Sequence, residues 1–116
     1  MSRDILMHVP KPGARRRLYV FPYAGGNPAA FLPWSAGLGA DVALSVISLP
    51  GRGARIGTPP LTSMREAAMS IAAAIAAEPR HPFGFFGHSM GAVRMLEVAR
   101  IATLMHLRMP DVMIAS

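Results

Sequence analysis

A serine between two glycines is the part of the sequence with the clearest potential for chemistry. Residues 87–91 read Gly-His-Ser-Met-Gly and fit the pattern G-x-S-x-G. They follow an apolar run at 83–86, which we predict to be a strand, and they open a helical pattern that continues to about residue 104. A strand-to-helix turn is the context that a nucleophile elbow requires.

The glycines matter because a turn of this kind is sharp, and a Cβ at Gly87 or Gly91 would collide with neighbouring backbone. The turn lifts the Ser89 hydroxyl above the sheet, where the helix dipole and free N–H groups stabilise developing negative charge. We therefore predict that Ser89 is a nucleophile, held in an elbow formed with Gly87, His88 and Gly91. The alternative is a serine that only caps the helix.

Acyl chemistry at a serine also needs an oxyanion hole made of two backbone N–H groups. One should come from Met90, the residue after the nucleophile, and the other from the loop after the neighbouring strand. Residues 21–27, Phe-Pro-Tyr-Ala-Gly-Gly-Asn, stand where that loop should be. Gly25 and Gly26 would let its backbone bend toward the serine, although an ordinary strand-to-helix turn would have the same composition.

Short apolar runs alternate with helical patterns along the chain. The predicted strands are 18–21, 42–47, 83–86 and 112–115, and the predicted helices are 28–38, 64–75 and 90–104. Asn27 is a suitable N-cap for the first helix, and Ser63 with Glu66 forms a capping box before the second. This order predicts an α/β fold, with a parallel sheet of about four strands and helices on both faces. In such a sheet the chemistry lies beyond the carboxyl ends of the strands.

The composition excludes several classes of function. The 116 residues suffice for one domain, 52% of them are apolar, and cysteine is absent, so a disulfide or a thiolate site is excluded. We expect no cofactor and no metal. The net charge is +6, but the dense run at 15–17 has no interleaved aromatic residues, so we expect no nucleic-acid partner. No targeting signal or membrane-length apolar run is found, which favours a cytoplasmic protein without a membrane partner.

Three motifs in register resemble one known family. FPYAGG, then PGRGAR followed by PPLTS, then FFGHSMGA and EVAR, occur in this order, and the resemblance runs from about Arg17 to Ser116. Together they resemble the type II thioesterases that serve polyketide and nonribosomal peptide synthetases. One departure is Ala54, where that family often has an acidic residue.

The resemblance implies the α/β-hydrolase fold and a serine thioesterase. Such an enzyme removes acyl groups from phosphopantetheine arms, so the implied partner is an acyl or peptidyl carrier protein. Matched to the motifs, Ser89 would be the nucleophile, and the backbone amides of Ala24 and Met90 would form the oxyanion hole.

The rest of a catalytic triad is hard to find. A serine needs a base, and in this fold the order is serine, acid, histidine. His88 points elsewhere in the elbow, His81 precedes a strand, and His106 lies at the far end of a helix, so only His8 stays open. Five of the six acids lie before strands or on helices: Asp41, Asp111, Glu66, Glu78 and Glu97.

Compared with complete members of that family, the chain ends before the later strands, the lid, and the catalytic aspartate and histidine. We therefore expect a single truncated domain over 1–116, with 1–16 as a loosely ordered arm and with impaired activity. Its exposed last strand would favour self-association. Two alternatives stay open: a non-catalytic remnant that binds a carrier protein through Arg52 and Arg55, and a fragment of a general esterase or lipase.

Overall fold

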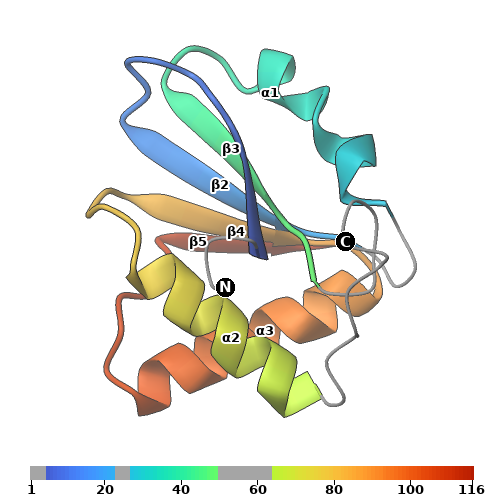
Figure 1. Cartoon of the computed structure of the whole chain (residues 1–116), viewed down its shortest axis with the longest axis vertical. Helices are drawn as coiled ribbons and strands as arrows, with labels where there is room; N and C mark the ends of the chain where they lie inside the picture. The colour runs from blue at the N-terminus through green and yellow to red at the C-terminus, as the bar shows by residue number, and fades with distance from the viewer. Residues whose placement is uncertain (1–4, 23–26, 50–63) are drawn as a thin grey trace.

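In a computed structural model, residues 5–22, 27–49 and 64–116 are described, and they form a sheet with helices on two sides (Figure 1). The elements in chain order are β1 (Leu6–Val9), β2 (Arg16–Phe21), the 3-10 helix η2 (Pro28–Phe31), α1 (Trp34–Gly37), β3 (Val42–Ile47), α2 (Met64–Ala76), β4 (Phe83–Gly87), α3 (Met90–Leu104) and β5 (Val112–Ala115). No helix among these residues is long and apolar enough to cross a membrane.

The sheet has the strand order β1-β3-β2-β4-β5. Strands β3, β2, β4 and β5 run parallel, and their register pairs Val20 with Val46 and Phe21 with Gly87. The α/β prediction is confirmed. All four residues of β5 are exposed, and β5 forms one edge of the sheet, as expected for the last strand.

The other edge corrects two predictions. The sheet has five strands, not about four, because Leu6–Val9 pairs antiparallel with β3 and lies within what was expected to be a loose arm. Burial of Ile5 and Leu6 holds this segment, and the Ser48 amide donates to the Ile5 carbonyl at 2.7 Å. A turn at Gly13, whose φ is 87°, then reverses the chain into β2.

Two apolar cores lie on opposite faces of the sheet. Under α2 and α3, the aromatic residues Tyr19, Phe21, Phe83 and Phe85 pack with the helices' buried side chains. A smaller cluster lies under η2 and α1 and includes Val20, Leu44, Val46 and Phe31. Helices therefore cover both faces, as predicted (Figure 1).

The first predicted helix is broken into two short pieces. Asn27 caps it as expected, since its side-chain oxygen accepts from the Ala29 amide at 3.0 Å. Pro33 then stands between η2 and α1, and because proline lacks an N–H, one continuous helix over 28–38 does not form. The second helix, α2, matches its predicted range closely, but its capping residue Ser63 lies outside the described residues.

Candidate active site

Ser89 lies on the turn between β4 and α3, and its backbone adopts φ 56° and ψ −124°. A residue other than glycine rarely takes a positive φ, and such strain is typical of functional turns. Ser89 occupies the N-cap position of α3, but its side chain makes no capping hydrogen bond. The side chain is exposed, so the capping alternative has no support and the hydroxyl stays accessible.

The two flanking glycines are required by close backbone contacts, as predicted. A Cβ on Gly87 would lie 2.7 Å from the Ala92 Cα. A Cβ on Gly91 would lie 2.5 Å from the Pro22 carbonyl oxygen and closer still to that of Phe21. Gly91 thus allows the start of α3 to press directly against the end of β2.

Backbone hydrogen bonds from both neighbouring strands fix the elbow. The His88 amide donates to the Phe21 carbonyl of β2 at 3.3 Å. On the other side, the Ser116 amide donates to Gly87 and the Ser89 amide donates to Ser116, both at 2.9 Å. The elbow is therefore held between β2 and the residue that follows β5.

The amides at the start of α3 bear on the oxyanion hole. Those of Gly91 and Ala92 donate to the His88 and Ser89 carbonyls at 2.8 and 2.9 Å. Met90 precedes them in the first turn, where an N–H has no acceptor within the helix. The second predicted donor, Ala24, lies outside the described residues together with Gly25 and Gly26. Because β2 ends beside the elbow, its following loop starts at the right place, but the role of Ala24 stays a prediction.

None of the four histidines is placed to serve as the base of Ser89. The His88 ring contacts the Ser116 hydroxyl through Nδ1 at 3.2 Å. His81 precedes β4, and His106 lies past the far end of α3, roughly 24 Å along the helix axis from its start. The strand pairing places His8 of β1 in line with Phe85 of β4, with β3 and β2 between them. His8 is therefore three strand spacings, or roughly 14 Å, away from β4.

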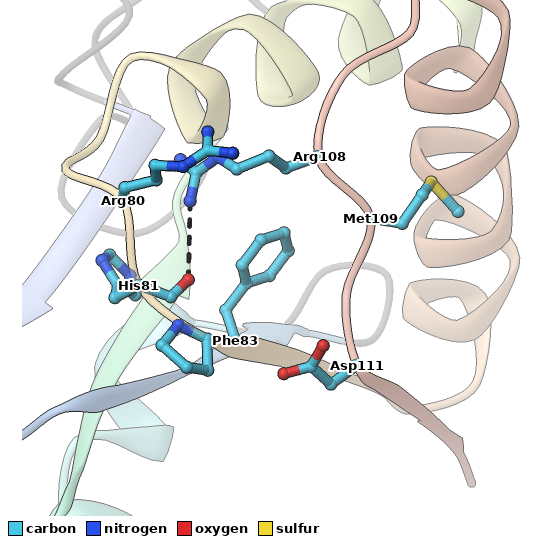
Figure 2. Close-up of a pocket in the computed structure, with 7 residues that line it drawn as sticks. Arg80, His81, Phe83, Arg108, Met109 and Asp111 are labelled. Atoms are coloured by element: carbon cyan, nitrogen blue, oxygen red, sulfur yellow. Dashed lines mark hydrogen bonds between the residues drawn. The ribbon is translucent and has the colours of Figure 1, made fainter.

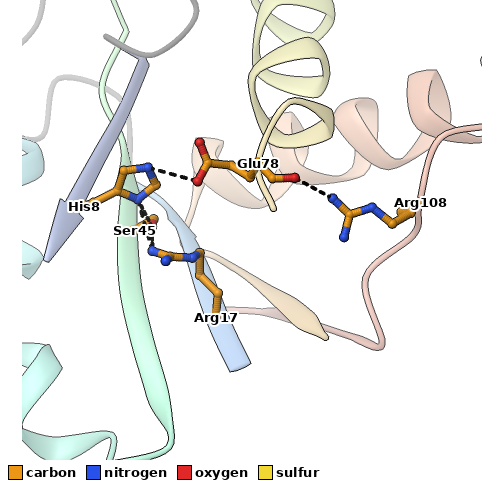
Figure 3. A network of polar contacts seen from close by, with 5 residues as sticks. All are labelled: His8, Arg17, Ser45, Glu78 and Arg108. Carbon is orange, nitrogen blue, oxygen red and sulfur yellow. Dashed lines mark hydrogen bonds and ion pairs between the residues drawn. The ribbon is translucent and has the colours of Figure 1, made fainter. Parts of the chain in front are cut away.

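His8 belongs instead to a polar network around the buried Ser45, which sequence reasoning missed (Figure 3). Its Nδ1 lies 2.5 Å from the Ser45 hydroxyl and its Nε2 lies 3.3 Å from the Glu78 carboxylate. These three residues have the order of contacts of a catalytic triad. However, Ser45 is fully buried and accepts a hydrogen bond from the Arg17 guanidinium at 2.6 Å, so no substrate can reach it. The network joins β1 to the sheet and to the turn that follows α2.

Replacing Ser45 with alanine tests that structural role. The change removes the buried hydroxyl that both Arg17 and His8 contact, so we expect the free energy of unfolding to fall by about 2 kcal/mol. Ser70→Ala, a half-buried serine on α2, is the matched control and should change stability little. Urea denaturation followed by circular dichroism measures both. Equal midpoints for the two variants would show that the network does not stabilise the fold.

The carboxylates are mostly engaged elsewhere. Asp41 pairs with Arg15 at 2.9 Å and with Arg16 at 3.4 Å, and the hydrogen bond from Arg15 lowers the pKa of Asp41. Glu97 pairs with Arg100, and that hydrogen bond lowers the pKa of Glu97. Asp41 and Asp111 precede β3 and β5, at the amino ends of the strands. In the described part of the chain, no group of three metal-binding side chains is found.

The strand, turn and helix around Ser89 have the geometry that was expected of a nucleophile elbow. The Thioesterase domain family model matches residues 16–103, from β2 to near the end of α3. The chain belongs to the thioesterase domain family.

Two curated relatives are named as a biosynthesis protein and as a thioesterase. The gramicidin S biosynthesis protein GrsT of Aneurinibacillus migulanus is 40% identical over 87 residues, which are 75% of this chain and 34% of that protein. Thioesterase TesA of Mycobacterium leprae is 39% identical over 84 residues, covering 71% of this chain and 32% of TesA. The chain thus spans about a third of the length of these curated relatives.

Solved structures give the same result. RedJ, a thioesterase from the prodiginine biosynthetic pathway in Streptomyces coelicolor, has a TM-score of 0.78 and 34% identity, over 91% of this chain and 42% of RedJ. The type II thioesterase BorB from the borrelidin biosynthetic cluster has a TM-score of 0.82 and 28% identity, over 95% of this chain and 45% of BorB. The resemblance to type II thioesterases is thereby confirmed.

Proposed function

We propose that this chain carries the nucleophile of a thioester hydrolase that removes acyl groups from phosphopantetheinyl carrier proteins in polyketide or nonribosomal peptide biosynthesis. The observation that carries the proposal is the position of Ser89 between β4 and α3. Its backbone has φ 56°, and its hydroxyl makes no capping hydrogen bond to the helix. Relatives of the chain are named for gramicidin S, prodiginine and borrelidin biosynthesis, which supports this class of pathway.

In the proposed reaction, the Ser89 oxygen attacks the thioester carbonyl while its proton passes to a base. The Met90 and Ala24 amides stabilise the oxyanion, which collapses to an acyl-serine and releases the protonated pantetheine thiol. Water then attacks the acyl-serine and releases the carboxylic acid. Since no histidine of this chain is placed to act as the base of Ser89, the proposal assigns the base, and the acid that orients it, to polypeptide outside residues 1–116.

A chemical-rescue experiment tests Ser89 without that base. The 116-residue chain is mixed with an acyl-phosphopantetheinyl carrier protein, with and without added imidazole as an external base, and the released acid is measured. We expect slow hydrolysis that imidazole accelerates roughly tenfold or more in the chain and in Ser70→Ala, but not in Ser89→Ala. Equal acceleration of Ser89→Ala would refute the assignment of the nucleophile.

The same assay separates the two alternatives. A faster reaction with a matched oxygen ester than with the thioester would favour a general esterase. Carrier-protein binding with no serine-dependent hydrolysis, even with imidazole, would favour the non-catalytic remnant. The arginines invoked for that binding, Arg52 and Arg55, lie outside the described residues, so their part stays a prediction.

A further inference from the structure

A cavity of about 450 Å³ lies at the amino ends of β4 and β5, the end of the sheet opposite to Ser89. Two loops form it, one before each strand (Figure 2). Arg80, His81 and Phe83 come from the first loop and the start of β4, and Arg108, Met109 and Asp111 come from the second. The function proposed for Ser89 makes no use of this cavity.

Arg108 is held by contacts with its neighbours, and its guanidinium keeps further N–H donors for a ligand. Its two terminal nitrogens donate to the carbonyls of His81 at 3.4 Å and Glu78 at 3.2 Å. Its guanidinium carbon lies 5.7 Å from the centre of the Phe83 ring, within the range of a cation–π contact. Since a guanidinium carries five N–H donors, these contacts leave others free for a ligand.

The positive charge of the cavity is not neutralised at its arginine end. Among the described residues, neither Arg80 nor Arg108 forms an ion pair. In the view of Figure 2 both guanidinium groups lie at one end of the cavity, the Phe83 ring lies in the middle, and Asp111 lies at the other end. Burial lowers the pKa of His81, which favours the neutral form of its ring.

We propose that this cavity binds a small molecule through a phosphate or carboxylate group, which Arg80 and Arg108 hold. Planar guanidinium groups match both oxyanions, and paired arginines are suited to recognise them. Asp111 repels a bare anion and accepts a hydrogen bond from a ligand that carries a hydroxyl or amine. The site is separate from Ser89, so the proposal stands independently of the hydrolase reaction.

The test is an NMR titration of the labelled 116-residue chain with inorganic phosphate and, in a second arm, with acetate. Sodium chloride at equal ionic strength is the reference, because it reproduces screening without a specific oxyanion. We expect saturable shifts of the backbone amides of residues 81, 83, 108, 109 and 111, since residues 82 and 110 are prolines and have no amide proton. The arm that binds more tightly identifies the preferred group. Shifts in both arms that match those in chloride would overturn the proposal.

Charge-changing variants test whether phosphate affinity changes in the direction that the proposed site requires. Arg80→Gln should weaken phosphate binding by roughly threefold, and Asp111→Asn should strengthen it by about the same factor. Arg100→Gln removes the same charge from the exposed face of α3, where Arg100 already pairs with Glu97, and should leave the affinity unchanged. Equal weakening by Arg80→Gln and Arg100→Gln would show only a response to net charge, and would refute the site.

Discussion

Gly91→Ala is expected to destabilise the chain by about 3 kcal/mol or more, which is a large part of the stability of a small domain. The added Cβ would lie 2.5 Å from the Pro22 carbonyl oxygen and closer to that of Phe21. Neither atom belongs to a flexible side chain, so α3 would have to move away from β2. That movement would also break the bond from the His88 amide to Phe21.

Gly37→Ala is the matched control, because Gly37 is also a helical glycine. It lies in α1, and no atom approaches within 4 Å of its Cβ position. Helix propensity alone would make both substitutions stabilising by 0.5 to about 1 kcal/mol. We therefore expect opposite signs, measured as the urea midpoint of each variant. A Gly91→Ala midpoint equal to that of the parent chain would contradict the packing described at the elbow.

Raising the pH from 9 to 12 is expected to lower the free energy of unfolding by about 2 kcal/mol through Tyr19 alone. Tyr19 is 1% exposed, and burial raises the pKa of its phenol from 10.0 to about 12. Because the folded chain holds the proton more tightly than the unfolded chain, the stabilisation is complete below pH 10. It is then lost as the pH rises through 12.

Tyr19→Phe isolates this effect, since phenylalanine keeps the edge contacts with Phe83 and Phe85 but cannot ionise. The chain suits the experiment because it has two tyrosines, no cysteine and a single lysine, Lys11. Urea denaturation at a series of alkaline pH values should give a flatter curve for Tyr19→Phe. If the two curves fall in parallel, another group must cause the alkaline loss.

Local patterns were enough to predict most of the elements. Val42–Ile47, Met90–Leu104 and Val112–Ala115 have the predicted bounds, because continuous apolar runs and helical spacing are strong signals. The need for Gly87 and Gly91 was also predictable, since G-x-S-x-G between a strand and a helix implies a steric requirement.

The features that the sequence did not reveal depend on distant contacts. Strand β1 has four residues, and its burial varies between Leu6 and His8, so little in the sequence separates it from a loop. The Ser45 network joins β1, β2, β3 and the turn after α2, and the arginine cavity joins two loops that only the sheet brings together. Strand order decides these juxtapositions, and single-residue patterns do not encode it.

The central position of β2 has a consequence for synthesis on the ribosome. β2 pairs with β3 on one edge, but its other edge waits for β4, and Phe21 pairs with Gly87. At roughly 5–20 residues per second, the stretch between them takes several seconds to make. During that interval the nascent chain presents an apolar strand edge, which is a site for pairing with other chains. The elbow therefore forms late in synthesis. Correct folding requires that the chain be synthesised as far as Gly91 before the free edge of β2 pairs with a strand of another chain.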